Sequence, residues 1–231
     1  ICEIRKKFPK DAILAEETMT ASASRPSVRS ARFCWVIDPL DGTHNFVRGT
    51  PIFGVSIAVL DDGAPAAAAV VDVMTGIVYL AAAGEGAHAD GRRLAVRAES
   101  MGGRVVIAIP SGREQATSGP LLAELSRWTL RNLGSSALHL AQVACGGVDA
   151  AFALQVKLWD WAAGALLVTE AGGGVVDPAG RPWRRFDMAG DLEVDMPYIA
   201  GPASPVDELR GNVTSVCRPC GLALRGGCPA F

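Results

Sequence analysis

The sequence lacks the features that would place the chain in a membrane or on nucleic acid. No uninterrupted apolar run among the 231 residues has the length of a membrane-spanning helix. Lys and Arg (22) nearly balance Asp and Glu (24), and no basic block stands out. The start, ICEIRKKFPKDAILAEE, is interrupted by charges and lacks a small-residue cleavage site, which argues against a secretory signal. We therefore expect no nucleic-acid partner and no membrane partner.

Cysteines are few in the body of the chain, where three are scattered, and the other three lie in the last fifteen residues; we interpret the body as a reduced, cytoplasmic protein. The first three, in apolar or Gly-rich surroundings, are expected to be small buried side chains. Near the C-terminus, Cys217-x-x-Cys220 has the spacing of half a zinc site, but no second half and no nearby histidine accompany it. The Pro and Gly content of residues 210–231 instead predicts a disordered tail. The six cysteines are Cys2, Cys34, Cys145, Cys217, Cys220 and Cys228.

The order of apolar segments indicates the class of fold. Strands are predicted at 12–15, 33–37, 51–60, 66–74, 76–82 and 105–109. Helices are then predicted at 120–128, 136–145 and 161–171 and from 206 onward, with strands at 148–154, 175–176 and 197–200. Residues 84–91 are interpreted as a turn region. Strands first and mixed elements afterwards favour an α+β or layered α/β architecture.

Four acidic residues occur where hydrophobic segments stop. They are Glu16, Asp38, Asp41 and Asp160. Functional sites of layered α/β proteins lie at such strand ends. If the four carboxylates meet, their repulsion raises their pKa values unless a cation offsets it. Magnesium prefers oxygen ligands and is often shared with substrate phosphate, so the sequence points to a Mg²⁺ site.

The residues around Asp38 and Asp41 suit the same chemistry. Pro39 stiffens the turn and would let the Leu40 carbonyl point toward a cation. The stretch Gly42-Thr43-His44-Asn45 resembles the start of a helix, where free N–H groups bind phosphate. The Thr43 hydroxyl can orient a water molecule. Together these features suggest metal-assisted hydrolysis of a phosphate ester.

Each acidic feature also has a simpler explanation. Asp-Pro-Leu-Asp-Gly is typical of a surface turn, and Glu16-Glu17 is typical of a solvated pair. Asp160 can cap the helix that follows it. Spacing alone does not bring these residues together, so a purely structural use of the acids stays open.

Two long motifs resemble the signatures of a known family. WVIDPLDGTHNF (Trp35–Phe46) resembles W-x-x-D-P-x-D-G-T-x-N-F, the first signature of the inositol monophosphatase family. WDWAAGALLVTEAGG (Trp159–Gly173) resembles its second signature, and Ala15-Glu16-Glu17 is similar to its G-E-E. The similarity extends from Phe8 to Leu209.

The resemblance implies a single domain over 1–209, with subdomains 1–110 and 111–209, folded as an α-β-α-β-α sandwich. It implies Mg²⁺-dependent phosphomonoesterase activity by in-line attack of metal-bound water. The implied ligands are Glu16, Asp38 and the Leu40 carbonyl for one ion and Asp38, Asp41 and Asp160 for another. Glu16 and Thr43 would position the water, and the amides of Gly42 and Thr43 would receive the phosphate.

The resemblance also bears on substrate and assembly. Gly134-Ser135-Ser136-Ala137 matches a family stretch near the substrate hydroxyls, which implies substrate contacts from Gly134, Ser135 and Ser136 together with Asp41 and Asp160. Ala153 replaces a glutamate that contacts inositol in the family. Because Asn45-Phe46 after Gly-Thr resembles the inositol phosphatase branch of the family more than its histidinol-phosphate branch, we rank inositol 1-phosphate or a similar polyol phosphate first and histidinol phosphate second.

The chain starts inside a helical pattern, so we expect that N-terminal helices of the family precede it and are absent here. A catalytically impaired member with a binding role is therefore a further alternative. A homodimer is compatible with the family resemblance.

Overall fold

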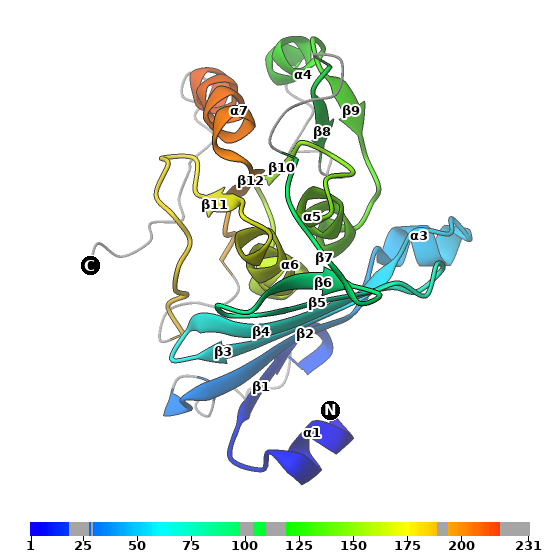
Figure 1. Cartoon of the computed structure of the whole chain (residues 1–231), viewed down its shortest axis with the longest axis vertical. Helices are drawn as coiled ribbons and strands as arrows, with labels where there is room; N and C mark the ends of the chain where they lie inside the picture. The colour runs from blue at the N-terminus through cyan, green and yellow to red at the C-terminus, as the bar shows by residue number, and fades with distance from the viewer. Residues whose placement is uncertain (19–27, 29, 98–103, 110–118, 189–193, 218–231) are drawn as a thin grey trace.

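The structure is a computed structural model of the chain, and it describes residues 1–18, 28, 30–97, 104–109, 119–188 and 194–217. Helices and sheets alternate in layers along the long axis of the molecule (Figure 1). Helix α1 (Cys2–Lys7) lies outside a first sheet, and α5 (Ser136–Ala144) and α6 (Leu158–Glu170) separate it from a second sheet. Helices α4 (Gly119–Leu125) and α7 (Ala203–Cys217) cover the far side. This order confirms the layered α-β-α-β-α architecture.

The first sheet has seven strands in the order of the sequence. Its strands are β1 (Ala12–Ala15), β2 (Phe33–Asp41), β3 (Gly54–Asp61), β4 (Ala64–Asp72), β5 (Val78–Ala82), β6 (Gly86–Ala89) and β7 (Arg92–Arg93). Only β1 and β2 are parallel within it, so the expected antiparallel meander is confirmed. The interpretation of residues 84–91 as a turn is wrong for β6. Its small residues carry no strand propensity, and pairing with β5 imposes the strand.

The second sheet has five strands in the order β11-β12-β10-β8-β9. They are β8 (Val106–Ala108), β9 (Thr129–Arg131), β10 (Ala150–Ala153), β11 (Gly174–Val176) and β12 (Tyr198–Gly201). The β8–β9 and β8–β10 pairs are parallel, and the β10–β12 and β11–β12 pairs are antiparallel. The sheet is therefore mixed in strand direction, and its strands alternate with helices along the chain after residue 110, as the sequence predicts.

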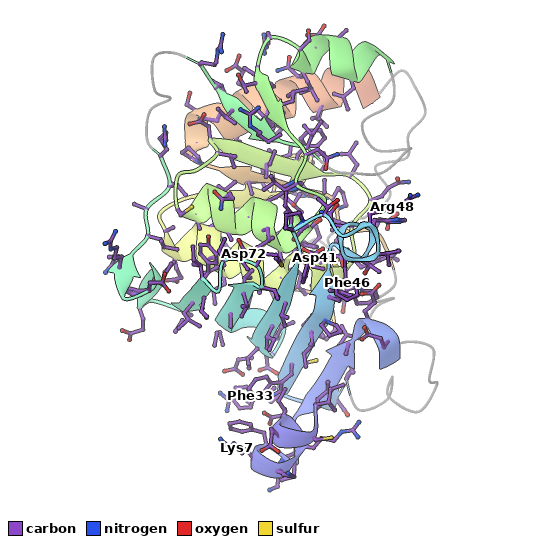
Figure 2. The ribbon with its side chains drawn as sticks, turned by 90° about the vertical axis from the view of Figure 1, so that its right-hand side faces the viewer. Lys7, Phe33, Asp41, Phe46, Arg48 and Asp72 are labelled. Carbon is purple, nitrogen blue, oxygen red and sulfur yellow. The ribbon has the colours of Figure 1, made fainter. Side chains whose placement is uncertain are left out.

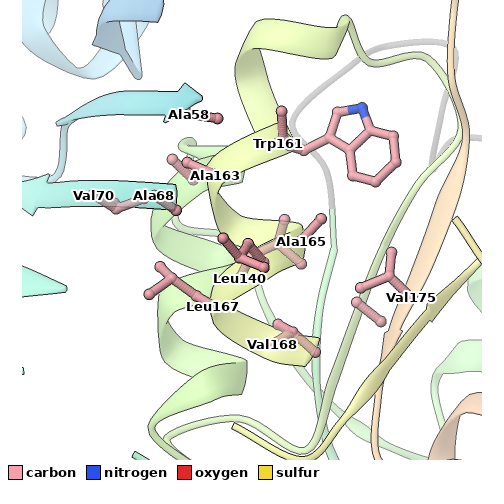
Figure 3. Close-up of a cluster of buried hydrophobic side chains, with 14 of the residues drawn as sticks. Ala58, Ala68, Val70, Leu140, Trp161, Ala163, Ala165, Leu167, Val168 and Val175 are labelled. Carbon is pink, nitrogen blue, oxygen red and sulfur yellow. The ribbon is translucent and has the colours of Figure 1, made fainter. Parts of the chain in front are cut away.

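Helix α6 is buried on every side because it lies between the two sheets (Figure 3). Trp161 and Leu167 are fully enclosed, and small residues fill most of the remaining turns. An added Cβ at Gly164 would lie 2.5 Å from Leu140 Cβ, so glycine permits the close approach of α5. This packing fixes the start of α6, and with it Asp160, against the first sheet.

The last helix corrects one boundary. Helix α7 continues past Leu209 to Cys217, so the expectation of a disordered tail is wrong for residues 210–217. Val206, Leu209 and Val213 follow helical spacing and are buried with Leu121 and Leu125 in a second core. The rest of the expected tail, including Cys220 and Cys228, lies outside the described residues. No helix in the described part of the chain has the length and apolar character needed to cross a bilayer.

The cysteine prediction holds at one position only. Cys34 is buried in β2, and burial raises the pKa of its thiol to about 12. Cys2 and Cys145 are exposed, so the expectation that they are buried is wrong. Cys2 begins α1 and Cys145 follows the last turn of α5. At such helix ends, apolar or Gly-rich neighbours in the sequence do not imply that a residue is buried.

Candidate active site

Strand β2 carries Asp38 and Asp41 into the interior. The predicted strand ended at Ile37, but pairing with β3 continues to Asp41, with a register shift between Asp38 and Asp41. Pro39 lies exposed in this irregular stretch, where its missing N–H breaks no regular ladder. The exposed fractions of Asp38 and Asp41 are 2% and 8%. The two acids therefore belong to a buried strand end, and the alternative of a solvated surface turn is wrong.

Asp41 is held by the beginning of helix α5. Its Oδ2 accepts hydrogen bonds from the Ser135 hydroxyl and from the Ala137 amide, both at 2.6 Å. Burial raises the pKa of Asp41 to about 6, and these hydrogen bonds limit the increase. The Ser135 oxygen also accepts from the Leu138 amide at 3.1 Å and caps α5. The buried Ser135 hydroxyl is thus committed to a carboxylate and a helix cap, and we assign it to the support of Asp41.

Asp38 shares its surroundings with the other acids. Its Oδ1 accepts from the Leu40 amide at 2.9 Å. Burial and then the nearby Asp41 raise the pKa of Asp38 to about 8, and Asp160 and Glu16 add to the increase. Glu16 follows β1 in a short 3-10 helix, Glu16–Thr18. Burial also raises the pKa of Glu16, although a hydrogen bond with Asp38 lowers it in part.

Asp160 lies inside the first turn of α6, not before the helix as expected. Its Oδ2 accepts from the Lys157 amide at 3.0 Å, so it caps the helix by reaching back to the preceding residue. Burial raises the pKa of Asp160 to about 7, with further increases from Asp41 and Glu16. The Lys157 amide and ammonium offset this only in part. The alternative that Asp160 caps the helix is therefore correct for its Oδ2. The same carboxyl also lies near Asp41 and Glu16, which raise its pKa.

The four acids reach one locality from three distant parts of the sequence. Glu16, Asp41 and Asp160 each raise the pKa of Asp38, and Glu16 also raises the pKa values of Asp41 and Asp160, so the four carboxyls lie near one another. As placed, no three His, Cys, Asp or Glu side chains among the described residues come close enough to enclose a metal ion. The oxygen-only donor set nevertheless has the chemistry of a hard divalent cation site. The mutual repulsion is the kind of strain that such a cation relieves.

Gly42 and Thr43 complete this locality. Gly42, with φ of 92°, precedes helix α3 (Thr43–Arg48), which lies beside Asp41 in Figure 2. The predicted helix start is thus correct. The Thr43 hydroxyl donates to the Leu40 carbonyl at 3.0 Å, which links the two groups predicted to hold water and metal. A Cβ at Gly42 would lie 3.1 Å from the Ile52 carbonyl and 3.3 Å from the Gly134 carbonyl, so a side chain does not fit.

The other predicted residues lie around the same centre, and one neighbour was missed. Ser136, half-buried, begins helix α5, and Gly134 precedes it in a left-handed conformation with φ of 75°. Ala153 is buried in β10 and pairs with Tyr198 of β12. Tyr198 escaped the sequence analysis because its short strand carries no motif. Burial raises the pKa of this tyrosine, and Asp41 and Asp160 raise it further, so its ring lies near the acid cluster.

The structure combines a layered sandwich of two sheets and three helix layers with a cluster of acids at the end of β2 and the start of α6. A profile of the Inositol monophosphatase family matches residues 1–203. The chain therefore belongs to the inositol monophosphatase family.

Several known proteins are similar to the chain over most of its length. Nus factor SuhB of Xylella fastidiosa is 37% identical over 92% of this chain and 76% of its own length. Inositol monophosphatase 2 of Solanum lycopersicum is 36% identical over 80% of this chain and 71% of its own length. The structure of the Thermotoga maritima IMPase superposes with a TM-score of 0.79 at 30% identity, covering 94% of this chain and 80% of that one.

Proposed function

We propose that the chain is a Mg²⁺-dependent phosphomonoesterase for a small polyol or sugar phosphate. The observation that carries the proposal is the convergence of Asp38, Asp41 and Asp160, whose pKa values are raised to about 8, 6 and 7. A cluster of buried carboxyls that repel one another destabilises the fold, and such clusters occur mainly at functional sites. Membership of the inositol monophosphatase family supports phosphate esters as the substrate class.

The acids and the Leu40 carbonyl would form two Mg²⁺ sites. Glu16, Asp38 and the Leu40 carbonyl would hold one Mg²⁺, and Asp38, Asp41 and Asp160 would hold a second. Bound there, the ions supply Lewis acidity and lower the pKa of coordinated water. Asp41 is oriented for this task by Ser135 and Ala137, and Asp160 by the Lys157 amide.

The remaining residues handle the water and the phosphate. The exposed Glu16 carboxylate accepts the proton of the attacking water, and the Thr43 hydroxyl, fixed by its bond to the Leu40 carbonyl, orients that water. The Gly42 and Thr43 amides face the phosphate oxygens. Attack is in line with the leaving oxygen of the polyol, and no covalent enzyme intermediate forms.

Substrate choice follows from what surrounds the acids. Ala153 offers no carboxylate to a sugar ring, so recognition of the hydroxyls falls to Asp41, Asp160 and the Gly134-Ser135-Ser136 stretch. Most of the Ser135 contribution is indirect, through Asp41. We therefore favour a polyol phosphate such as inositol 1-phosphate, with histidinol phosphate as the second choice. Because Cys2, Cys34 and Cys145 are free thiols, we also favour the cytoplasm as its location.

A phosphate-release screen tests the proposal. Purified chain is incubated with inositol, histidinol, fructose and adenosine phosphates, with Mg²⁺ and with EDTA. We expect release from a polyol phosphate only with Mg²⁺, and nearly complete loss of turnover in Asp160→Asn. Asp207→Asn, which changes an exposed acid on α7, is the matched control and should keep its activity. No release from any ester with Mg²⁺ present would contradict the proposal.

A binding role without turnover is the second candidate. One observation favours it: several relatives carry the name Nus factor SuhB. Under this alternative Mg²⁺ raises the unfolding temperature of the chain, but turnover stays negligible on every ester. Mg²⁺-dependent release by the wild-type chain would exclude it as the main role.

A further inference from the structure

Helix α3 carries Thr43 but has almost no hydrophobic attachment to the rest of the molecule. None of its six residues is buried, and Val47 is 74% exposed. Its apolar contact with the body is the edge-to-face packing of Phe46 on Phe53, with ring centroids 5.2 Å apart. A helix this short has little stability of its own. Polar contacts must therefore fix its position.

The side chain of Asn45 supplies these contacts. Its Nδ2 donates to the Ile52 carbonyl and to the Leu133 carbonyl, both at 2.7 Å. The two carbonyl acceptors settle which side-chain atom is the nitrogen. Leu133 is 88 positions away in the sequence, so the second bond joins α3 to the loop before helix α5. Asn45 is the half-buried residue of an otherwise exposed helix.

The loop that contains Leu133 is also hydrogen-bonded to helix α5. The Leu133 amide donates to His139 Nε2 at 2.9 Å, so the imidazole is neutral and accepts at that nitrogen. Burial lowers the pKa of His139 to about 4, which keeps it neutral. Residue Leu133 is thus bonded to α3 through its carbonyl and to α5 through its amide.

The segments around this contact approach one another closely. An added Cβ at Gly134 would lie 2.5 Å from Asn45 Nδ2, and one at Gly42 would lie 3.3 Å from the Gly134 carbonyl. The next residue along the loop is Ser135, whose hydroxyl holds Asp41. Asn45 therefore connects the segment that carries Thr43 directly to the segment that orients Asp41.

We propose that Asn45 is a positioning residue that locks α3 to loop 132–135, and so sets Thr43 and Asp41 relative to each other. The proposal rests on the proposed function for its catalytic consequence, but the lock itself is a property of the chain without metal. Asn45→Asp is the decisive change, because it keeps the shape and removes both donors. A carboxylate there would also face two carbonyl oxygens, which repel it.

The test combines hydrogen exchange with kinetics. In Mg²⁺-free protein, we expect Asn45→Asp to speed amide exchange in residues 42–49 and 132–137 and to leave the α6 amides as in the wild type. Well below the unfolding temperature, kcat should fall about tenfold or more while KM changes little, as expected for misplaced catalytic groups. Val47→Ala, on the exposed side of the same helix, should behave as the wild type in both measurements.

Gly134→Ala provides a second route to the same result. Its new methyl group would displace Asn45 without removing a donor, and at a φ of 75° it would also strain the loop, so exchange should become faster in the same residues. Unchanged exchange at 132–137 in Asn45→Asp would overturn the lock. Faster local exchange with wild-type kcat would overturn the positioning role. If the wild-type chain releases no phosphate, the proposed function fails, while the exchange data still decide whether Asn45 locks the loop.

Discussion

Replacing Asp38 by asparagine should stabilise the chain when no divalent ion is present. Asp38 is almost completely buried, and burial together with Asp41 raises its pKa from 3.8 to about 8. The charged carboxylate therefore costs folding free energy at neutral pH. Asparagine keeps an oxygen that accepts from the Leu40 amide, and its amide can donate to Glu16. The substitution removes the charge and keeps the shape.

The expected gain follows from the shift in pKa. Each unit is worth about 1.4 kcal/mol, so a rise from 3.8 to about 8 sets an upper limit of about 6 kcal/mol. The acids can share protons, which lets neighbouring carboxyls relieve part of this cost in the wild type. We expect a gain of about 2 kcal/mol in the free energy of unfolding at a pH of about 8.

The stability difference between Asp38→Asn and the wild type should depend on pH in a known direction. Because the folded pKa is raised, the destabilisation appears as pH rises above 3.8 and is complete above about 8. Urea unfolding in EDTA should show the advantage of Asp38→Asn at about pH 8 and little advantage at about pH 4. Adding Mg²⁺ should stabilise the wild type and leave the variant unchanged.

A control acid has the opposite electrostatics. A hydrogen bond from Arg32 lowers the pKa of Asp61, so Asp61→Asn should not stabilise the chain at any pH in this range. The reasoning would be refuted if Asp38→Asn were less stable than the wild type in EDTA at about pH 8. It would also be refuted if Mg²⁺ stabilised variant and wild type equally.

Three other changes test the packing and polar contacts around the site. Glu170 accepts from two backbone amides at 2.9 and 2.8 Å, so Glu170→Gln should lower the free energy of unfolding by about 1–2 kcal/mol in urea, and a neutral result would contradict the contact. Burial lowers the pKa of His139 from 6.5 to about 4, so the contribution of its neutral imidazole to stability should be complete above pH 6.5 and decrease by about 2–3 kcal/mol as pH drops toward 4. His139→Gln should flatten this loss relative to the wild type in urea titrations across that range, whereas His88→Gln should not. Gly164→Ala places a methyl group against Leu140 and should cost about 1–3 kcal/mol; an unchanged unfolding midpoint would mean that α5 and α6 are less tightly packed than described.

The sequence could predict the elements whose pattern is local. The apolar runs at 12–15 and 51–60 predicted the strands observed at Ala12–Ala15 and Gly54–Asp61, and the spacing of Leu138, Leu140 and Ala141 predicted helix α5. The family signatures pointed to the acids of β2 and α6. In each case the residues that determine the element lie within a few positions of one another.

The misses share a non-local cause. Pairing with β3 carries β2 through Pro39, although proline usually ends a central strand. Asp160 lies inside α6 because Leu158 and Trp159 are already enclosed between the sheets. The bond between Asn45 and Leu133 joins residues 88 positions apart, and neither residue type signals it. Contacts of this kind depend on the assembled layers, which no short window of sequence contains.

The assignment of ion-holding roles to the acids, and the domain boundaries within 1–209, stay predictions. The structure brings Glu16, Asp38, Asp41 and Asp160 into one locality.

Calorimetric titration of Mg²⁺ into the purified chain tests the convergence of the acids most directly. The wild type should show saturable binding of Mg²⁺. Asp160→Asn should weaken this binding at least about tenfold, because one ligand of the ion is removed. The control Asp207→Asn should bind Mg²⁺ as the wild type does. Equal Mg²⁺ affinity in the wild type and Asp160→Asn, or no binding by the wild type, would contradict the account.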